Sequence, residues 1–142
     1  MRGWMIGLAA ALALLTSGCN FNATTSQSDP ELNTRADALY RNLAAGRDAD
    51  VAAQMSSDND PAQVQAQLPM LRRLIGSATP PAPHVSWTQM MRSTGGSFYT
   101  VAQDYDYGDR IVHVETRFKG ENDEWKVMAF NVNVRAKANA LP

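Results

Sequence analysis

The sequence is poor in the residues that most often carry catalysis or hold metals. It has one cysteine, Cys19, and two histidines among 142 residues. A single cysteine cannot form an intramolecular disulfide, and it excludes a cysteine metal cluster. With two histidines and no nucleophile-elbow motif, the sequence supports no Ser-His-Asp catalytic triad. We therefore expect no cofactor, no bound metal and no enzyme of that kind.

An excess of charge of either sign is also lacking. The chain has 13 Lys and Arg against 14 Asp and Glu, a net charge of −1. Loss of Arg2 with an N-terminal leader would bring this to about −2. Such a balance gives no general attraction to nucleic acid or to anionic lipid. Nucleic acid is therefore not an expected partner.

The apolar run near the N-terminus is too short to span a bilayer. It extends from Trp4 to Leu15, behind Arg2 and ahead of small residues, whereas a spanning helix needs about 20 residues. This is the pattern of a secretory leader. The segment Leu15-Thr16-Ser17-Gly18-Cys19 resembles the lipobox of bacterial lipoproteins, although Thr16 stands where that family most often has leucine. An ordinary secretory signal is the alternative.

Resemblance to the lipoproteins implies how the N-terminus is processed. In that family the cysteine sulfur receives a diacylglycerol, a peptidase cuts before the cysteine, and the new amino group is usually acylated. Residues 1–18 would then be the signal peptide, and 19–28 the lipidated Cys19 with a flexible, polar tether. Asn20 is not the aspartate that resembles an inner-membrane retention signal. We therefore expect lipid anchoring on the periplasmic side of the outer membrane.

Three stretches with helical spacing of apolar residues follow. The first opens either with Asp29 as cap and Pro30 at the first position, or with a capping box of Ser28 and Glu31. A short second helix, capped by Asp48 and running through Met55, is expected next. A third starts at Asp60-Pro61 and is expected to be kinked or split by Pro69. The first apolar stripe consists of Leu32, Ala36, Leu39, Tyr40 and Leu43.

Four runs that alternate apolar and polar residues predict strands. Short turns rich in glycine separate them, so neighbouring strands are expected to pair antiparallel. In the first run Val85, Trp87 and Met91 are expected on one face. The runs are His84–Arg92, Phe98–Tyr107, Ile111–Lys119 and Glu124–Arg135. The inward face of the second and third is predicted to hold Tyr99, Val101, Gln103, Tyr105, Val112, Val114 and Phe118.

The fourth run does not keep a single alternation. Phe118 opposite Trp125 and Val114 opposite Met128 are two pairings that differ by one residue. A β-bulge near 127–129 would reconcile them, because it inserts one residue and resets the phase. A regular strand that exposes Trp125 as a partner site is the alternative.

The order of elements predicts an α+β domain at 29–135, with a tail at 136–142. N-terminal helices would cover the apolar face of a curved four-stranded antiparallel sheet. The arrangement resembles the cystatin-like, nuclear-transport-factor-2-like superfamily, in Leu39-Tyr40, in Leu43 to Asp48 and in the closing strand from Glu124 to Met128. That superfamily includes enzymes, binding modules and assembly parts, so the resemblance implies a fold rather than a function.

Several residue groups are candidate sites, each with a structural alternative. Spacing of Asp104, Asp106 and Glu115 imitates a calcium loop, but the order Gly108-Asp109 is the reverse of what that loop needs and favours a plain hairpin. His113 with Glu115 and Asp104 is a candidate acid–base cluster. Met90, Met91 and His84 are candidate copper ligands, although strand methionines are mostly core. Candidates for a ligand platform, or else for the core, are Trp87, Tyr99, Tyr105 and Tyr107.

These observations favour a non-enzymatic, lipid-anchored domain. It would face the periplasm and bind a protein, a peptide or a small ligand such as a glycan. A second copy of the chain is a further candidate partner. The alternative is a small-molecule cyclase or isomerase that uses the space between helices and sheet. A titratable group in an open helix–sheet cavity would favour that enzyme.

Overall fold

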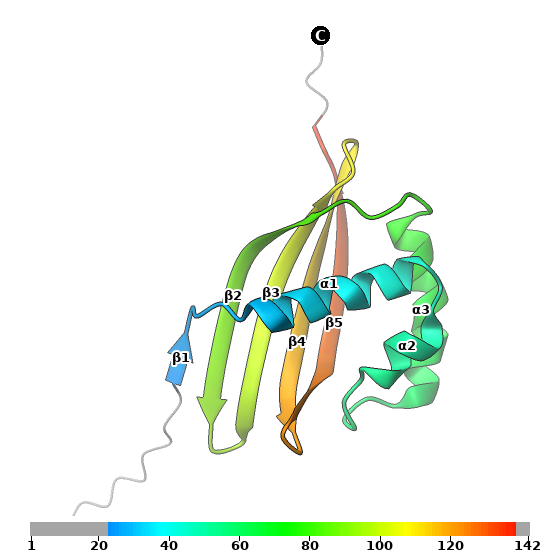
Figure 1. The fold of residues 1–142 in the computed structure, drawn as a ribbon. Coiled ribbons are helices and arrows are strands. Elements are labelled where there is room, and N and C mark those ends of the chain that lie inside the picture. The colour runs from blue at the N-terminus through cyan, green and yellow to red at the C-terminus, as the bar shows by residue number, and fades with distance from the viewer. Residues whose placement is uncertain (1–22, 139–142) are drawn as a thin grey trace, which may run out of the picture.

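The computed structural model describes residues 23–138, which form one antiparallel sheet with helices on one face (Figure 1). The helices are α1 (Pro30–Ala44), α2 (Asp48–Ala53) and α3 (Pro61–Ile75). The strands, in sheet order, are β1 (Ala23–Thr25), β2 (Pro83–Ser93), β3 (Gly96–Asp106), β4 (Arg110–Glu121) and β5 (Glu124–Ala136). The predicted α+β class and the four-strand meander are confirmed. The expected signal peptide, Cys19 and residues 139–142 lie outside the described residues.

Helix α1 lies across the sheet (Figure 1). The Asp29 carboxylate caps it by accepting the backbone N–H of Leu32 at 3.1 Å, and Pro30 takes the first helical position. This confirms the Asp29 alternative over the Ser28 capping box. All five residues of the predicted apolar stripe are buried against the sheet. Among residues 23–138, no helix has both the length and the apolar character needed to cross a membrane.

Helices α2 and α3 lie beside the β5 end of the sheet (Figure 1). Asp60 caps α3, and the helix continues through Pro69 to Ile75. The helix is therefore not split, because Pro69 lies on its exposed side, where water can solvate the carbonyl that lost its donor. Leu68 and Ile75 bury the opposite side in the core.

The inward face of the central strands is as predicted. Tyr99, Val101, Gln103 and Tyr105 of β3 lie opposite Phe118, Thr116, Val114 and Val112 of β4. All eight side chains are buried, because α1 covers this face of the sheet. The alternation of apolar residues therefore identified the core face of β3 and β4 correctly.

Strand β5 contains the predicted bulge. Phe118 pairs with Val127 and Arg117 pairs with Ala129, so Met128 is the extra residue. The bulge lets Trp125 and Val127 share the helix-covered face with Phe130, Val132 and Val134. Neither pairing proposed from the sequence occurs, because Trp125 lies opposite Gly120 and Val114 lies opposite Val132. The bulge was therefore predicted correctly from the change of phase in the apolar pattern, but both of the proposed residue pairings were wrong.

Strand β2 contains a second bulge, which the sequence did not reveal. Val85 pairs with Gln103 and Trp87 pairs with Ala102, which leaves Ser86 unpaired between them. The Ser86 hydroxyl donates instead to the carbonyl of Ala102 at 3.2 Å. Val85 therefore faces the helix side while Trp87 faces the opposite side. The expectation that Val85 and Trp87 share a face is wrong for this reason.

The expected flexible tether is wrong for its second half. Ala23 and Thr25 of β1 pair with Arg92 and Met90 at the end of β2. The next residues are held too, since the Thr88 hydroxyl donates to the carbonyl of Ser26 at 3.2 Å. The chain is therefore attached to the domain from residue 23 onward.

Candidate functional site

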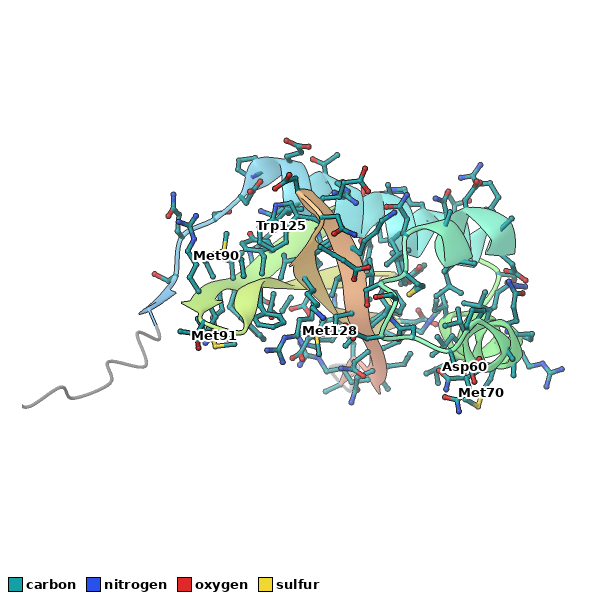
Figure 2. The ribbon with its side chains drawn as sticks, turned by 90° about the horizontal axis from the view of Figure 1, so that it is seen from below. Asp60, Met70, Met90, Met91, Trp125 and Met128 are labelled. Atoms are coloured by element: carbon teal, nitrogen blue, oxygen red, sulfur yellow. The ribbon has the colours of Figure 1, made fainter. Side chains whose placement is uncertain are left out.

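The two faces of the sheet differ in what covers them. Figure 2 shows Met90 and Trp125 on the side of α1, and Met91 and Met128 on the opposite side. We call that opposite side the open face, because no described helix packs on it (Figures 1 and 2). Its side chains are therefore not covered by any helix of residues 23–138.

Trp87 is the most exposed large apolar side chain of the open face. It is 41% exposed, and its partner Ala102 is fully buried although it lies on the same face. Only neighbouring side chains of the open face can cover Ala102, and Trp87 and Glu115 are its partners on the two sides. Trp87 therefore presents a large aromatic ring to solvent over a tightly covered strand.

Another aromatic side chain of the open face, Phe98, lies toward the β2–β3 hairpin. The guanidinium carbon of Arg117 lies 5.0 Å from the centre of the Phe98 ring, a cation–π geometry. Met91 and Phe98 are cross-strand partners on the same face, and both are partly exposed. Phe98 was not among the candidate residues, although its alternation with Tyr99 places it on the face opposite the core.

Three titratable side chains come together on the open face. His113 Nδ1 lies 2.6 Å from Asp104 Oδ1, and His113 Nε2 lies 3.3 Å from Glu115 Oε1. Arg135 Nη2 lies 3.8 Å from the other Asp104 oxygen. Partial burial lowers the pKa of His113, but the hydrogen bonds with Asp104 and Glu115 outweigh it and raise the pKa above its ordinary value.

This cluster confirms that the candidate acid–base residues are neighbours. Both ring nitrogens of His113 have carboxylate partners. The three residues lie on the open face among Arg135 and Asn133. Their arrangement supplies a charged patch beside Trp87.

The four aromatic candidates do not form one platform. Trp87 lies on the open face, whereas Tyr99 and Tyr105 are fully buried under α1. The Tyr99 hydroxyl donates to Asn33 Oδ1 at 2.7 Å. Tyr107 is partly buried, and its hydroxyl lies 2.6 Å from that of Tyr40. Alternate strand residues point to opposite faces, and the bulge in β2 changes the phase of Trp87.

A carboxylate does reach the covered face, but it comes from a helix. Asp37 of α1 accepts a hydrogen bond from the Tyr105 hydroxyl at 2.9 Å and another from Arg41 Nε at 3.0 Å. Burial, followed by the negative charge of Asp37, raises the pKa of Tyr105 far above its ordinary value. Burial and the Tyr107 hydroxyl do the same for Tyr40, whose ring stacks on Tyr105. These groups hold α1 on the sheet.

The space between the helices and the sheet is nearly filled. A hollow of about 70 Å³ lies between α1, α3 and β5, lined by residues such as Leu43, Leu68 and Phe130. Ligand pockets usually measure about 300–1,000 Å³, so this hollow is much smaller than a typical one. The larger hollows lie at the surface, and one of about 480 Å³ separates the β2–β3 and β4–β5 hairpins.

The proposed metal ligands take up other partners. Asp106 accepts from the backbone N–H of Gly108 at 2.9 Å and pairs with Lys137 at 2.6 Å, as a hairpin residue does. Met90 is buried on the helix side of the sheet while Met91 lies on the open face. Within residues 23–138, no three His, Cys, Asp or Glu side chains are placed to hold one metal ion.

The fold and the open face define a small α+β domain with a helix layer on one side of an antiparallel sheet. Comparison with protein-family models, with curated proteins and with solved structures gave no match.

Proposed function

We propose that this protein is a lipid-anchored, non-enzymatic domain that binds a protein partner through the open face of its sheet. The arrangement of α1 across a meander supports a cystatin-like or nuclear-transport-factor-2-like domain. The proposed anchor is Cys19, acylated at the periplasmic side of the outer membrane. The observation that carries the binding proposal is the exposed Trp87 on an uncovered sheet face.

The side chains of this face suit a protein partner better than a small ligand. Trp and Arg are the residues most often found at the energetic centres of protein interfaces, and here Trp87, Phe98 and Arg117 share one face. The charged cluster around His113 borders them and would give orientation and specificity to a partner of complementary charge.

The covered face offers less support for the enzyme hypothesis. A cyclase or isomerase would need an open cavity with a free acid or base. The hollow there is about 70 Å³, and the Asp37 carboxylate is engaged by Tyr105 and Arg41. An interior of this kind supports a structural role for the carboxylate.

Mass spectrometry of the mature protein tests the anchor. We expect an N-terminal Cys19 that carries acyl chains, since two or three chains bind a membrane almost irreversibly. A Cys19→Ser variant should carry no acyl chains. An unmodified N-terminus at another residue would overturn the lipoprotein part of the proposal without touching the binding part.

Site-directed photocrosslinking in the producing cell tests the open face. A photoreactive residue at exposed Gln89, which pairs with Thr100 on the open face, should give one defined protein adduct. The same residue at Met70, 63% exposed on α3, should not give it. Trp87→Ala should abolish the Gln89 adduct, and the control Met70→Ala should leave it. Equal adducts from both positions, or no effect of Trp87→Ala, would refute the binding surface.

A further inference from the structure

We infer that the end of the sheet formed by the β2–β3 and β4–β5 hairpins lies against the lipid surface, with the opposite end of the sheet pointing away from the membrane. This inference rests on the proposed acylation of Cys19. It adds which surface of the domain meets the lipid.

The position of β1 carries the argument. Ala23 pairs with Arg92, the penultimate residue of β2, so the chain enters the sheet beside the β2–β3 hairpin (Figure 1). Three residues separate Cys19 from Ala23. A chain rises by at most about 3.6 Å per residue, so Ala23 lies within about 14 Å of an acylated Cys19.

One row of residues across the sheet places both hairpins at this level. Arg92 pairs with Ser97, and a side chain on Gly120 would come within 3.7 Å of the Ser97 Cβ. Gly120 in turn pairs with Trp125. The row therefore runs from Ala23 to Trp125, and both hairpins project beyond it on the same side (Figure 1).

The opposite end of the sheet is too far away to reach the same lipid surface. Strand β2 has 11 residues, which at about 3.3 Å per residue makes about 36 Å. The β3–β4 hairpin with Asp109 lies at that far end (Figure 1). Trp87 lies five residues from Arg92, about 17 Å above the row by the same rise. Trp87 would thus stand clear of the bilayer, accessible to a partner.

Charge at the hairpin end does not by itself attract a membrane. The surface hollow between the hairpins is lined by Trp125 together with Asp123 and Glu124. Its carboxylates would be repelled by anionic lipid, while a tryptophan ring is suited to the headgroup level. The short connection to Cys19 must therefore set the orientation, and a longer connection should lose it.

Fluorescence quenching on vesicles tests the orientation. The full chain is produced with its own leader and reconstituted in vesicles of phosphatidylethanolamine and phosphatidylglycerol. A thiol-reactive dye is placed at Thr94→Cys or at Asp109→Cys, both exposed positions. Once its sulfur is acylated, Cys19 cannot take up dye. With a nitroxide on the lipid headgroup, we expect the Thr94 label to be quenched several-fold more than the Asp109 label.

The outcomes separate this inference from the anchor itself. Protein that fails to sediment with the vesicles, or that takes up dye at Cys19, would refute the anchor. Protein that sediments but shows equal quenching, or stronger quenching at Asp109, would overturn the orientation alone. A 20-residue Gly-Ser insertion between Asn22 and Ala23 is the control. It should keep sedimentation and remove the difference, and a difference that survives it would overturn the role of the short connection.

Discussion

Deletion of Met128 tests the bulge in β5 and the burial that depends on it. Without the extra residue, one part of the strand must turn to the opposite face, because successive side chains alternate. The smaller rearrangement would turn the hairpin part, which moves Val127 and Trp125 to the open face. The larger one would expose Phe130, Val132 and Val134 and bury Asn131 and Asn133.

The structure sets the size of the expected effect. Val127 is 1% exposed, and burial of such a side chain contributes about 1.5–3 kcal/mol. Trp125 is only partly buried, so its share is below the roughly 3–5 kcal/mol of a fully buried tryptophan. We expect the deletion to lower the free energy of unfolding by about 3–5 kcal/mol, a large fraction of the 5–15 kcal/mol typical of a domain.

Urea unfolding followed by circular dichroism measures this loss. With a slope of about 1–3 kcal/mol per molar urea, the midpoint should fall by about 2 M. The control is Met128→Ala, which keeps the bulge and trims only a partly exposed side chain of the open face. A deletion variant that unfolds at the same midpoint as Met128→Ala would refute the assignment of the bulge.

Three further predictions concern the pH, a helix cap and metal ions. The fold raises the pKa of His113, so protonated His113 stabilises the fold below its ordinary pKa, and this stabilisation is lost as pH rises through the raised pKa. His113→Gln should therefore lower the urea midpoint more at pH 5.5 than at pH 8.5. An equal loss at both pH values would contradict this. Asp29→Ala should lower the free energy of unfolding in urea by about 1 kcal/mol, because it removes the α1 cap. The control is Glu31→Ala, which leaves the Asp29 cap in place and should be nearly neutral. Thermal melts with chelator and with added calcium should superimpose; a rise of several degrees with calcium would restore the Asp104–Glu115 hypothesis.

Alternation and caps made much of the fold predictable from the sequence. The buried faces of β3 and β4, the α1 stripe and the Asp29 cap depend on neighbours within a few residues. The bulge at Met128 was also predictable, because apolar residues change phase on both sides of it. The bulge at Ser86 was not predictable, because β2 lies near the edge of the sheet and most of its residues are exposed. Its two faces therefore show no clear alternation of apolar and polar residues.

The candidate site divides in the same way. His113 and Glu115 lie two apart on one strand, so the sequence placed them together, and Asp104 joins them across a tight hairpin. The contacts of Asp37 with Tyr105 depend on where α1 crosses the sheet, 68 positions away along the chain. No local pattern specifies that crossing. The position of Trp87 near His113, Asp104 and Glu115 likewise depends on the bulge at Ser86, which the sequence pattern did not predict.

The crossing of α1 over the meander also sets an order of events during synthesis. Each strand pair from β2 to β5 is joined by a tight turn and can form soon after it is made, but α1 is made before any strand that it covers. Asp29 and Tyr99, which hydrogen-bond at 2.9 Å, are 70 positions apart. The apolar stripe of α1 therefore waits for the sheet, and the complete core cannot assemble until β5 has left the ribosome. A chain with this order lacks its complete core for most of its synthesis.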